Sequence, residues 1–340
     1  MLSPALIAAF ATVAIAAIGL WWRREAARRR SHPVSGGLQP DVEVPSETEF
    51  ELYSNSFSHC SRKVRLALAE LHIDYTHRAT QLIETGWYET ISPAYLRVNP
   101  AGLLPTLVHR GRPIYESDDI LRYAQGVAGR NAPSLTPDGL DKRAEMERWI
   151  AFGSISSADA MGGMDAKAGA CIPGLTLPMF VAAIRHIPLK NILVGLLFHP
   201  DKRRPLFFIV AKLLGLRWTF RLPPARAIVD ESARHMRRHL AALNAALDAG
   251  EGPWLLGPSY TLADASMGAM LLRLDEAGWL AIFAEEQDLT ALLDYYGWMQ
   301  ERPSWRAAII ETPNAIIQAA TEQLTEVRAD PALRRFIYGS

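Results

Sequence analysis

The sequence predicts an α/β domain followed by an all-α domain, with a transmembrane helix at the N-terminus. Three observations support this expectation. Residues 50–130 alternate short strand-like runs with helical periodicity, residues 138–310 carry long helical patterns, and residues 4–22 form an uncharged apolar run. We expect residues 311–340 to form a C-terminal tail.

The N-terminal apolar run is long enough to cross a bilayer. At about 1.5 Å per residue, residues 4–22 span roughly 28 Å as a helix. A cleaved signal peptide is the alternative, but here the basic residues follow the apolar run, and Trp21 and Trp22 suit a membrane interface. We therefore expect residues 1–30 to form an uncleaved anchor with its basic flank on the cytoplasmic side, and residues 31–49 to form a flexible linker.

A strand-to-helix junction is expected after the linker. Phe50–Tyr53 alternates like a short strand, and from Ser61 the chain becomes helical. Ser58 therefore lies before the first turn of a helix, where unpaired backbone N–H groups and the helix dipole create positive potential. A Ser hydroxyl in that field can stabilise a thiolate. Lowering a thiol pKa from about 8.5 by roughly two units would leave most of it ionised at neutral pH.

A second motif surrounds the dipeptide Leu104-Pro105. It leads into a strand at Thr106–Val108, which a turn at residues 109–112 connects to a partner strand at Pro113–Tyr115. If Pro105 is cis, the preceding backbone is free to pair with an extended peptide ligand.

Glu116 and Ser117 begin another helix. A Ser hydroxyl, backbone N–H groups and a carboxylate can together bind an α-carboxylate and an α-ammonium, which are the two charges of a γ-glutamyl group. Each motif alone is common, because Ser before a helix is ordinary capping chemistry and X-Pro often precedes a strand. The three motifs in this order within about sixty residues indicate a glutathione site.

The α/β domain resembles the thioredoxin-like domain of the cytosolic glutathione transferase superfamily. Its Ser58-His-Cys-Ser motif is similar to the Ser-type motif of the zeta and theta-like classes. The resemblance implies that Ser58 is the catalytic residue and contacts glutathione. Leu104 would contact the cysteinyl moiety through its backbone, and Pro105 would be the family's cis-proline. Glu116 and Ser117 would bind the γ-glutamyl group.

Leu103 departs from the family's pattern, and Cys60 offers a different chemistry. Many relatives carry Lys or Gln where this chain has Leu103, so one polar contact to the glycyl carboxylate is missing. Cys60 could act as a low-pKa nucleophile, but thiol-transfer relatives carry Cys at the position of Ser58, so we favour a non-nucleophilic Cys60. Because Cys171 is the other cysteine of the chain, no disulfide framework is expected and a reducing compartment fits.

The second half resembles the all-helical domain of the same superfamily. We expect a helix from Leu140 to about Ser156, whose Trp149 and Phe152 would form the wall of a hydrophobic substrate site. A longer helix is expected at residues 223–250, and residues 261–264 form a capping-box-like start to a third, apolar helix.

An insertion at about residues 158–222 is longer than the turn expected between the first two of these helices. Its apolar stretches are interrupted by Pro178 and Pro188 and interleaved with basic residues. One interpretation is extra core helices, and the other is a segment that lies on a membrane or admits substrate. The insertion is also similar to one in the ganglioside-induced differentiation-associated proteins, which are membrane-anchored relatives with a C-terminal anchor.

Composition excludes several function classes. The 36 basic and 36 acidic residues cancel, so no net field favours nucleic acid, and neither a metal-ligand spacing nor a glycine-rich phosphate loop is present. The resemblance implies glutathione as co-substrate and a hydrophobic electrophile as partner, and it leaves a homodimer open. The N-terminal apolar run adds a membrane as a partner, and no metal is expected. The expected reaction is glutathione transfer to an electrophilic carbon, with dehalogenation, ether cleavage or isomerisation as variants. The alternative is a non-catalytic membrane adaptor that binds glutathione weakly.

Overall fold

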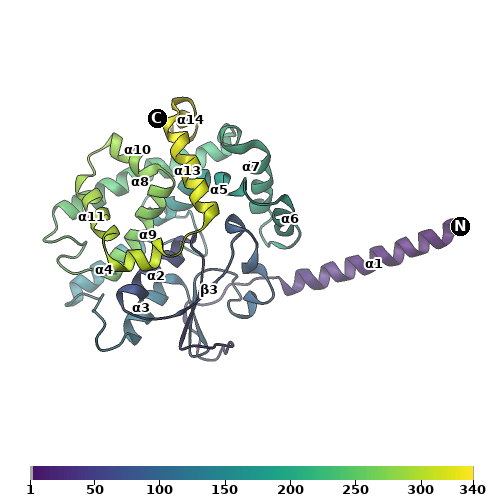
Figure 1. Ribbon diagram of the computed structural model, residues 1–340, viewed down its shortest axis with the longest axis horizontal. Helices are drawn as coiled ribbons and strands as arrows, with labels where there is room; N and C mark the ends of the chain where they lie inside the picture. Colours follow the sequence, from purple (N-terminus) through teal and green to yellow (C-terminus); the bar gives the residue numbers. More distant parts are fainter. Residues whose placement is uncertain (1–2, 340) are drawn as a thin grey trace.

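The computed structural model describes residues 3–339, which form a two-part body and one projecting helix, α1 (Pro4–Arg28) (Figure 1). Ser3 caps α1, since its side chain accepts a hydrogen bond from the backbone N–H of Leu6 at 3.3 Å. No residue of α1 is buried. Among the described residues α1 is the one helix that is long and apolar enough to cross a membrane, a test that a signal sequence in this position would also pass.

The N-terminal part is a five-stranded mixed sheet with two helices, as expected for a thioredoxin-like domain. The strand order is β1-β5-β4-β2-β3, in which β2 and β3 are parallel and the other neighbours are antiparallel. The elements are β1 (Gly37–Leu38), β2 (Phe50–Ser54), α2 (His59–Glu70), β3 (Thr76–Ala79), the 3₁₀ turns η1 (Ile83–Thr85), η2 (Glu89–Ile91) and η3 (Tyr95–Arg97), β4 (Thr106–His109), β5 (Arg112–Tyr115) and α3 (Ser117–Val127).

The hairpin of β4 and β5 confirms the expected strand–turn–strand order. His109 pairs with Arg112, and the two residues between them, Arg110 and Gly111, have φ of 50° and 78°. Positive φ at both central positions is the geometry that matches the twist of paired strands. Leu107 and Ile114 of the hairpin belong to the same core cluster as buried residues of α2 and α3, and β5 leads directly into Glu116.

The segment expected to be a flexible linker is bound to the domain. Gly37 and Leu38 pair with β5 as an edge strand, and the backbone N–H of His32 donates to the carbonyl of Pro100 at 2.9 Å. Val44 is buried and its N–H donates to the carbonyl of Gly111. Backbone pairing therefore orders a stretch whose composition alone is typical of a linker.

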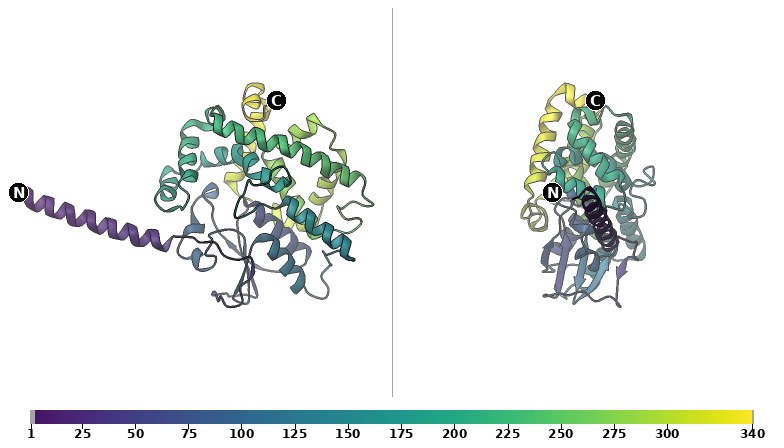
Figure 2. Two further views of the ribbon diagram at one scale, coloured as in Figure 1. Left: turned by 180° about the vertical axis from the view of Figure 1, so that it is seen from behind. Right: turned by 90° about the vertical axis from the view of Figure 1, so that its right-hand side faces the viewer.

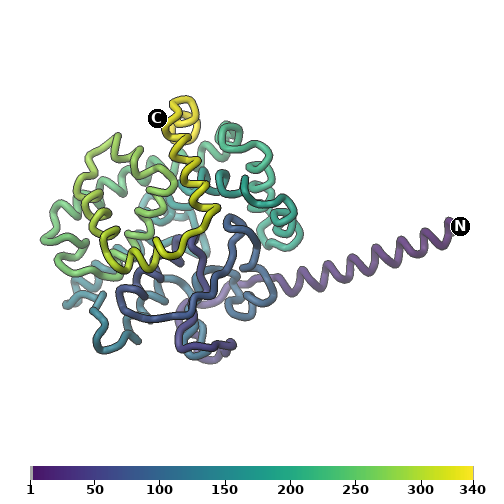
Figure 3. The backbone as a smooth tube through the Cα atoms, in the orientation of Figure 1, coloured from purple at the N-terminus to yellow at the C-terminus, as the bar shows by residue number. Residues whose placement is uncertain are grey.

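The C-terminal part is all-helical, and Figures 2 and 3 show it covering one side of the sheet domain. Its centre is α9, which is buried from Leu262 to Leu274 and begins with the expected capping box of Thr261 and Asp264. The elements are α4 (Leu140–Gly153), η4 (Ala168–Cys171), α5 (Ile172–Ile184), α6 (Leu189–Phe198), α7 (Arg203–Thr219), α8 (Pro223–Asp248), α9 (Leu262–Glu276), α10 (Trp279–Glu286), α11 (Thr290–Gln300), α12 (Pro303–Trp305), the π turn η5 (Arg306–Ile310), α13 (Ala315–Ala329) and α14 (Pro331–Ile337).

Two segments differ from simple expectations. The insertion forms α5, α6 and α7, of which α5 is a core helix packed against α7, α8, α9 and α13, whereas α6 and α7 expose several leucines. The expected C-terminal tail forms α13 and α14 instead, and Ile317, Leu324 and Ile337 bury their side chains in the same core. The buried residues of α13 recur at helical spacing, which explains why the segment packs against the core: Ile317, Ala320, Leu324 and Val327.

Candidate functional site

Ser58 lies at the junction of β2 and α2, as the sequence predicts. It is the N-cap of α2, and its Oγ accepts a hydrogen bond from the backbone N–H of Ser61 at 3.2 Å. The side chain is half-buried, and φ and ψ of −67° and 119° keep its backbone outside the helix. A hydroxyl that accepts one bond can still donate its own hydrogen, so Ser58 can serve as cap and as donor to an anion at once.

The loop before β4 is held by residues that sequence reasoning did not single out. The Leu104-Pro105 peptide bond is cis, as expected. The carbonyl of Leu103 accepts hydrogen bonds from the Tyr95 hydroxyl at 2.5 Å and from Nδ2 of Asn99 at 3.1 Å. Asn99 stands in the Asn-Pro-Ala-Gly motif, and its position before that turn is the sequence signal that could have identified it.

The structure brings four of the predicted residues to one cavity. Leu104, Pro105, Glu116 and Ser117 line a cavity of about 200 Å³, together with Cys60. We call it the Glu116 cavity. Glu116 has a φ of +62°, and Ser117 is the first residue of α3, so the side chains of both lie where the free N–H groups of that helix begin.

The Glu116 cavity has a wall that the sequence did not predict. Val34, from the segment before β1, is among its lining residues. Gly36 lies so close to the neighbouring side chains that an added Cβ would be 2.2 Å from Oδ2 of Asp119 and 3.1 Å from Cγ of Glu116. The chain that leads from α1 therefore passes along the edge of the candidate ligand site.

Ser58 lines a second cavity of about 230 Å³, which we call the Ser58 cavity. Cys60 and Ile155 line both cavities, so the two adjoin. The expected wall residues Trp149 and Phe152 are not among the residues that line the Ser58 cavity. Their rings pack against each other with centroids 5.4 Å apart, and Phe152 packs on His239. The apolar wall is formed instead by Phe57, Ile155, Ile172, Pro173 and Phe180.

Charged side chains also face the Ser58 cavity. Arg204 of α7 forms an ion pair with Glu84 at 2.5 Å, and the second carboxylate oxygen of Glu84 is buried without a partner in the described part of the chain. Arg273 of α9 is buried, donates to the carbonyl of Phe57 and lies 4.0 Å from the centre of the Phe57 ring. Burial, and then the charge of Arg62, lowers the pKa of Arg273 to about 9. Through its hydrogen bond to the carbonyl of Phe57, Arg273 fixes the residue that precedes Ser58.

His59 and Cys60 are not poised for nucleophilic chemistry. Burial, followed by the charges of Lys63 and Arg273, lowers the pKa of His59 to about 3, so its ring is neutral at physiological pH. Burial raises the pKa of Cys60, despite the opposing influence of Lys63 and a hydrogen bond with Ser117. Cys60 is therefore a thiol near neutral pH, which supports the interpretation that it is not the reacting group.

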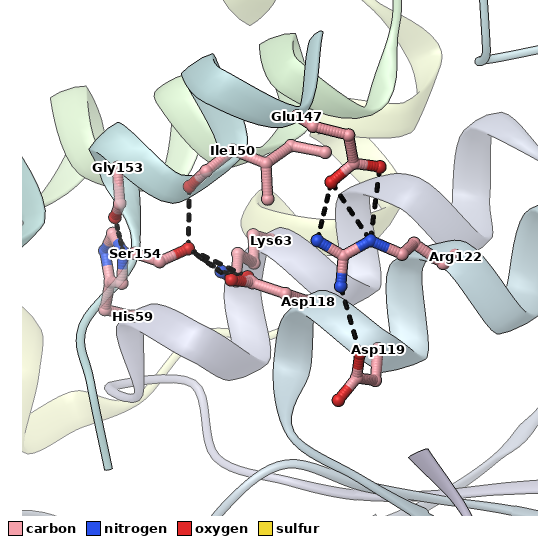
Figure 4. Close-up of polar contacts among 9 residues, drawn as sticks. All are labelled: His59, Lys63, Asp118, Asp119, Arg122, Glu147, Ile150, Gly153 and Ser154. Carbon is pink, nitrogen blue, oxygen red and sulfur yellow. Dashed lines mark hydrogen bonds and ion pairs between the residues drawn. The ribbon is translucent and has the colours of Figure 1, made fainter. Parts of the chain in front are cut away.

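An ion pair of the N-terminal domain is hydrogen-bonded to the end of α4 in the helical domain (Figure 4). Lys63 of α2 is fully buried and contacts Asp118 of α3, while the hydroxyl of Ser154 lies 2.7 Å from Oδ2 of Asp118 and 3.1 Å from Nζ of Lys63. Burial opposes ionisation of Asp118, but Lys63 and the bonds from Lys63 and Ser154 outweigh it and lower the pKa of Asp118. The pair sets α3, and hence Ser117, against α2 and the end of α4. Within residues 3–339 no group of His, Cys, Asp and Glu is placed to hold a metal ion.

Family models match both parts of the chain. Residues 57–126 match the glutathione S-transferase N-terminal domain, and residues 226–309 match the glutathione S-transferase C-terminal domain. The first match covers Ser58, the cis-proline and Glu116-Ser117, and the second runs from α8 into η5. Residues 127–225, which contain most of the insertion, lie between the two matches.

Curated relatives fall into two groups. Glutathione S-transferase 1 of Dianthus caryophyllus is 37% identical over 100 residues, which is 29% of this chain and 43% of that protein. The match thus spans less than half the length of that transferase. The human ganglioside-induced differentiation-associated protein 1-like 1 is 24% identical over 331 residues, covering 88% of this chain and 85% of that protein.

Solved structures share the fold. The β-etherase LigF from Sphingobium sp. strain SYK-6 superposes with a TM-score of 0.60 at 22% identity, over 78% of this chain and 98% of that one. Glutathione transferase F7 from Populus trichocarpa superposes with a TM-score of 0.54 at 18% identity, over 78% and 99%.

Proposed function

The chain belongs to the glutathione S-transferase superfamily, and on that premise we propose that it is a membrane-anchored enzyme that activates the thiol of glutathione. The observation that carries this proposal is the pair of adjoining cavities. The Glu116 cavity offers Glu116 and Ser117 to a γ-glutamyl group, and the Ser58 cavity offers an apolar wall. Ser58 lies on the second cavity beside Cys60 and Ile155, the two residues that both cavities share.

The proposed chemistry begins at the N-terminus of α2. The Ser58 hydroxyl donates to the thiolate sulfur, and the positive end of the helix dipole favours the negative charge. The thiolate attacks an electrophilic carbon held against Phe180 and Ile172, so a carbon–sulfur bond forms while a leaving group departs or a double bond accepts the electron pair. Arg273 and Arg204 suit an electrophile that also carries an oxygen acceptor or a carboxylate. Conjugation, dehalogenation, ether cleavage and isomerisation all share this first step.

The anchor places this chemistry at a membrane. α1 is apolar over the length of a bilayer and buries none of its residues in the body. Five arginines follow its apolar part, at positions 23, 24, 28, 29 and 30. By the positive-inside rule, this distribution favours a catalytic body that faces the cytoplasm.

A non-catalytic adaptor is the second candidate. Leu103 presents an exposed apolar side chain beside the Glu116 cavity, where relatives carry a polar group for the glycyl carboxylate. One relative that covers 88% of this chain is named a ganglioside-induced differentiation-associated protein. Both observations are compatible with weak glutathione binding.

Calorimetry of glutathione binding separates the two candidates. The charge-assisted hydrogen bonds that Glu116 accepts from the ligand ammonium and that Ser117 donates to the ligand carboxylate are each worth on the order of 1.5 to 3 kcal/mol. Glu116→Gln combined with Ser117→Ala should therefore weaken binding by at least about tenfold, because roughly 1.4 kcal/mol corresponds to one decade.

The matched control is Glu251→Gln combined with Ser259→Ala, which changes the same residue types at two exposed positions outside both cavities. It should bind glutathione like the unmodified protein. If the unmodified protein shows no heat of binding at millimolar glutathione, the adaptor replaces the enzyme as the proposed function.

A further inference from the structure

Helix α6 carries an apolar stripe that the body does not cover. Leu189, Leu193, Leu196 and Leu197 follow the spacing i, i+4, i+7 and i+8, and their exposed fractions are 43%, 41%, 38% and 49%. The packed side of α6 carries Ile192 and Gly195, which are its two buried residues. The exposed stripe is therefore the outward face of a helix whose inward face is already satisfied.

The stripe lies beside the end of α1. The rings of Trp21 and Phe198 meet edge to face with centroids 6.4 Å apart, and the guanidinium carbon of Arg29 lies 5.1 Å from the centre of the Phe198 ring. Figure 1 shows α6 on the side of the body from which α1 leaves, and the right-hand view of Figure 2 looks along α1 at that side. Phe198 is the last residue of α6 and follows Leu197 directly.

These contacts set the depth of α6 relative to a bilayer. Tryptophans at the end of a transmembrane helix lie at the membrane–water interface, so Trp21 marks that level and Phe198 shares it. Exposed basic side chains occur in α6 at Lys190 and at the start of α7 at Lys202 and Arg203, of which Arg203 pairs with Asp201. Arg29 contacts the end of α6 at Phe198. Leucines on one face with lysines and arginines around them are the composition of a helix that rests in the headgroup region.

We propose that the leucine stripe of α6 docks on the surface of the same bilayer that α1 spans. This inference rests on the anchor of the proposed function. A membrane is favoured over a protein partner because the contact between Trp21 and Phe198 already brings the stripe to the interface. α6 and α7 belong to the insertion that supplies Phe180 and Arg204 to the Ser58 cavity. Docking would hold that wall of the cavity next to the lipid, where an apolar electrophile is concentrated.

A fluorophore at position 197 tests the docking in the full chain. In a Cys60→Ala background, in which Cys171 is buried, Leu197→Cys and Leu140→Cys are labelled with an environment-sensitive dye. Leu140 is the control because it is a leucine that is 84% exposed on α4, away from α6. The protein is reconstituted into vesicles of phosphatidylcholine with phosphatidylserine that carry a headgroup nitroxide quencher.

We expect blue-shifted, strongly quenched emission at 197 and water-like, unquenched emission at 140. Adding Leu193→Asp should reduce the quenching at 197 at least severalfold while the protein still floats with the vesicles. Emission at 197 that equals that at 140 in floating protein would overturn the docking and leave the anchor intact. Blue-shifted but unquenched emission at 197 would assign the stripe to a protein contact and also overturn it. Full-length protein that does not float would remove both the anchor and the docking.

Discussion

The Ser58 hydroxyl caps α2 and is the proposed donor to the thiolate, so replacing Ser58 removes both. The Oγ accepts from the N–H of Ser61, so Ser58→Ala removes a helix cap worth about 1 kcal/mol as well as the proposed donor to the thiolate. We expect the pKa of the bound glutathione thiol to rise and turnover near neutral pH to fall, approaching about tenfold for each unit by which that pKa exceeds the assay pH. Turnover should recover as the pH is raised.

The measurement is a profile of activity against pH, supported by the ultraviolet absorbance of the bound thiolate. Ser58→Thr is the control, because it keeps both the cap and the hydroxyl. A profile that does not move in Ser58→Ala, with glutathione binding retained, would exclude the proposed role of Ser58.

His59 makes the stability of the protein sensitive to acid. Burial, then the charges of Lys63 and Arg273, lowers its pKa from 6.5 to about 3 in the folded protein. Below pH 6.5 the unfolded chain therefore binds a proton that the folded protein does not, so the free energy of unfolding falls as pH falls. At 1.36 kcal/mol per unit, the loss reaches about 2 kcal/mol by about pH 5.

Urea unfolding at several pH values checks this prediction. His59→Asn lacks the titrating ring and should show a flatter dependence between pH 6.5 and about pH 5. Lys63 and Ser154 outweigh burial and lower the pKa of Asp118, so Asp118 adds its own loss of stability only near and below its ordinary value of 3.8. It therefore does not contribute between pH 6.5 and about pH 5, where the two proteins are compared. An equal slope in both proteins would mean that another group controls the acid response.

The site residues that the sequence could identify are those that stand in a short motif of neighbouring residues. Ser58 before a helix, Pro105 before a strand and Ser117 at a helix start each sit in a short motif, and the structure brings them to adjoining cavities. Arg273 and Val34 could not be found in this way. Arg273 lies more than a hundred residues after these motifs, and Val34 lies before the first long strand. Their contacts with the site therefore depend on how the whole chain folds.

At the scale of elements, the tether between α1 and β2 lines the candidate ligand site. Val34 lines the Glu116 cavity, and glutathione carries a net negative charge at neutral pH. Val34→Asp would place a carboxylate at that cavity. We expect glutathione binding to weaken about fivefold, since two like charges about 4 Å apart in water repel by about 1 kcal/mol.

Val42→Asp is the matched control for this change. Val42 belongs to the same tether, is 37% exposed and does not line the cavity. Titration calorimetry of both variants measures the difference. Equal affinities would show that the tether wall does not approach the bound ligand.

Helices and strands were predicted correctly where the spacing of apolar residues and the turn or capping residues indicated the same element. The hairpin of β4 and β5 and the capping box at Thr261 and Asp264 are specified by adjacent residues, and both were predicted. β1 has two residues and no pattern of its own, so only its pairing with β5 defines it. In the insertion, α5 is apolar on all sides and buried, whereas α6 exposes the leucine stripe that we propose docks on a bilayer.

At the scale of the whole molecule, ion pairs join α2 to the helical domain along its length. Arg62 contacts Glu276 of α9 at 2.6 Å, and near the other end of α2 Glu70 contacts Arg302 at 2.5 Å. Both pairs are largely buried and bidentate, so breaking either would leave a charge without compensation. Ser58, which caps α2, is therefore held by the helical domain as well as by the sheet, and the two domains act as one support for the site.

α1 makes no comparable contribution to the body, and this difference predicts how truncations behave. A chain beginning at residue 31 loses only α1, in which no residue is buried, and its basic flank. A chain beginning at residue 45 also loses β1, Val34 and the buried Val44. The first truncation should keep the urea midpoint and the glutathione affinity of the full chain. The second should bind glutathione at least about tenfold more weakly, a difference of roughly 1.4 kcal/mol.

Membrane fractionation completes the comparison. The full chain should sediment with membranes and resist alkaline carbonate, because a spanning helix is retained when peripheral contacts are released. The chain beginning at residue 31 lacks α1 and would bind membranes through peripheral contacts such as that of α6, so carbonate should release it. Release of the full chain by carbonate, or its cleavage near Trp22, would show that α1 is not an anchor. Equal glutathione affinity of the two truncations would show that the tether is a spacer, as its composition alone suggests.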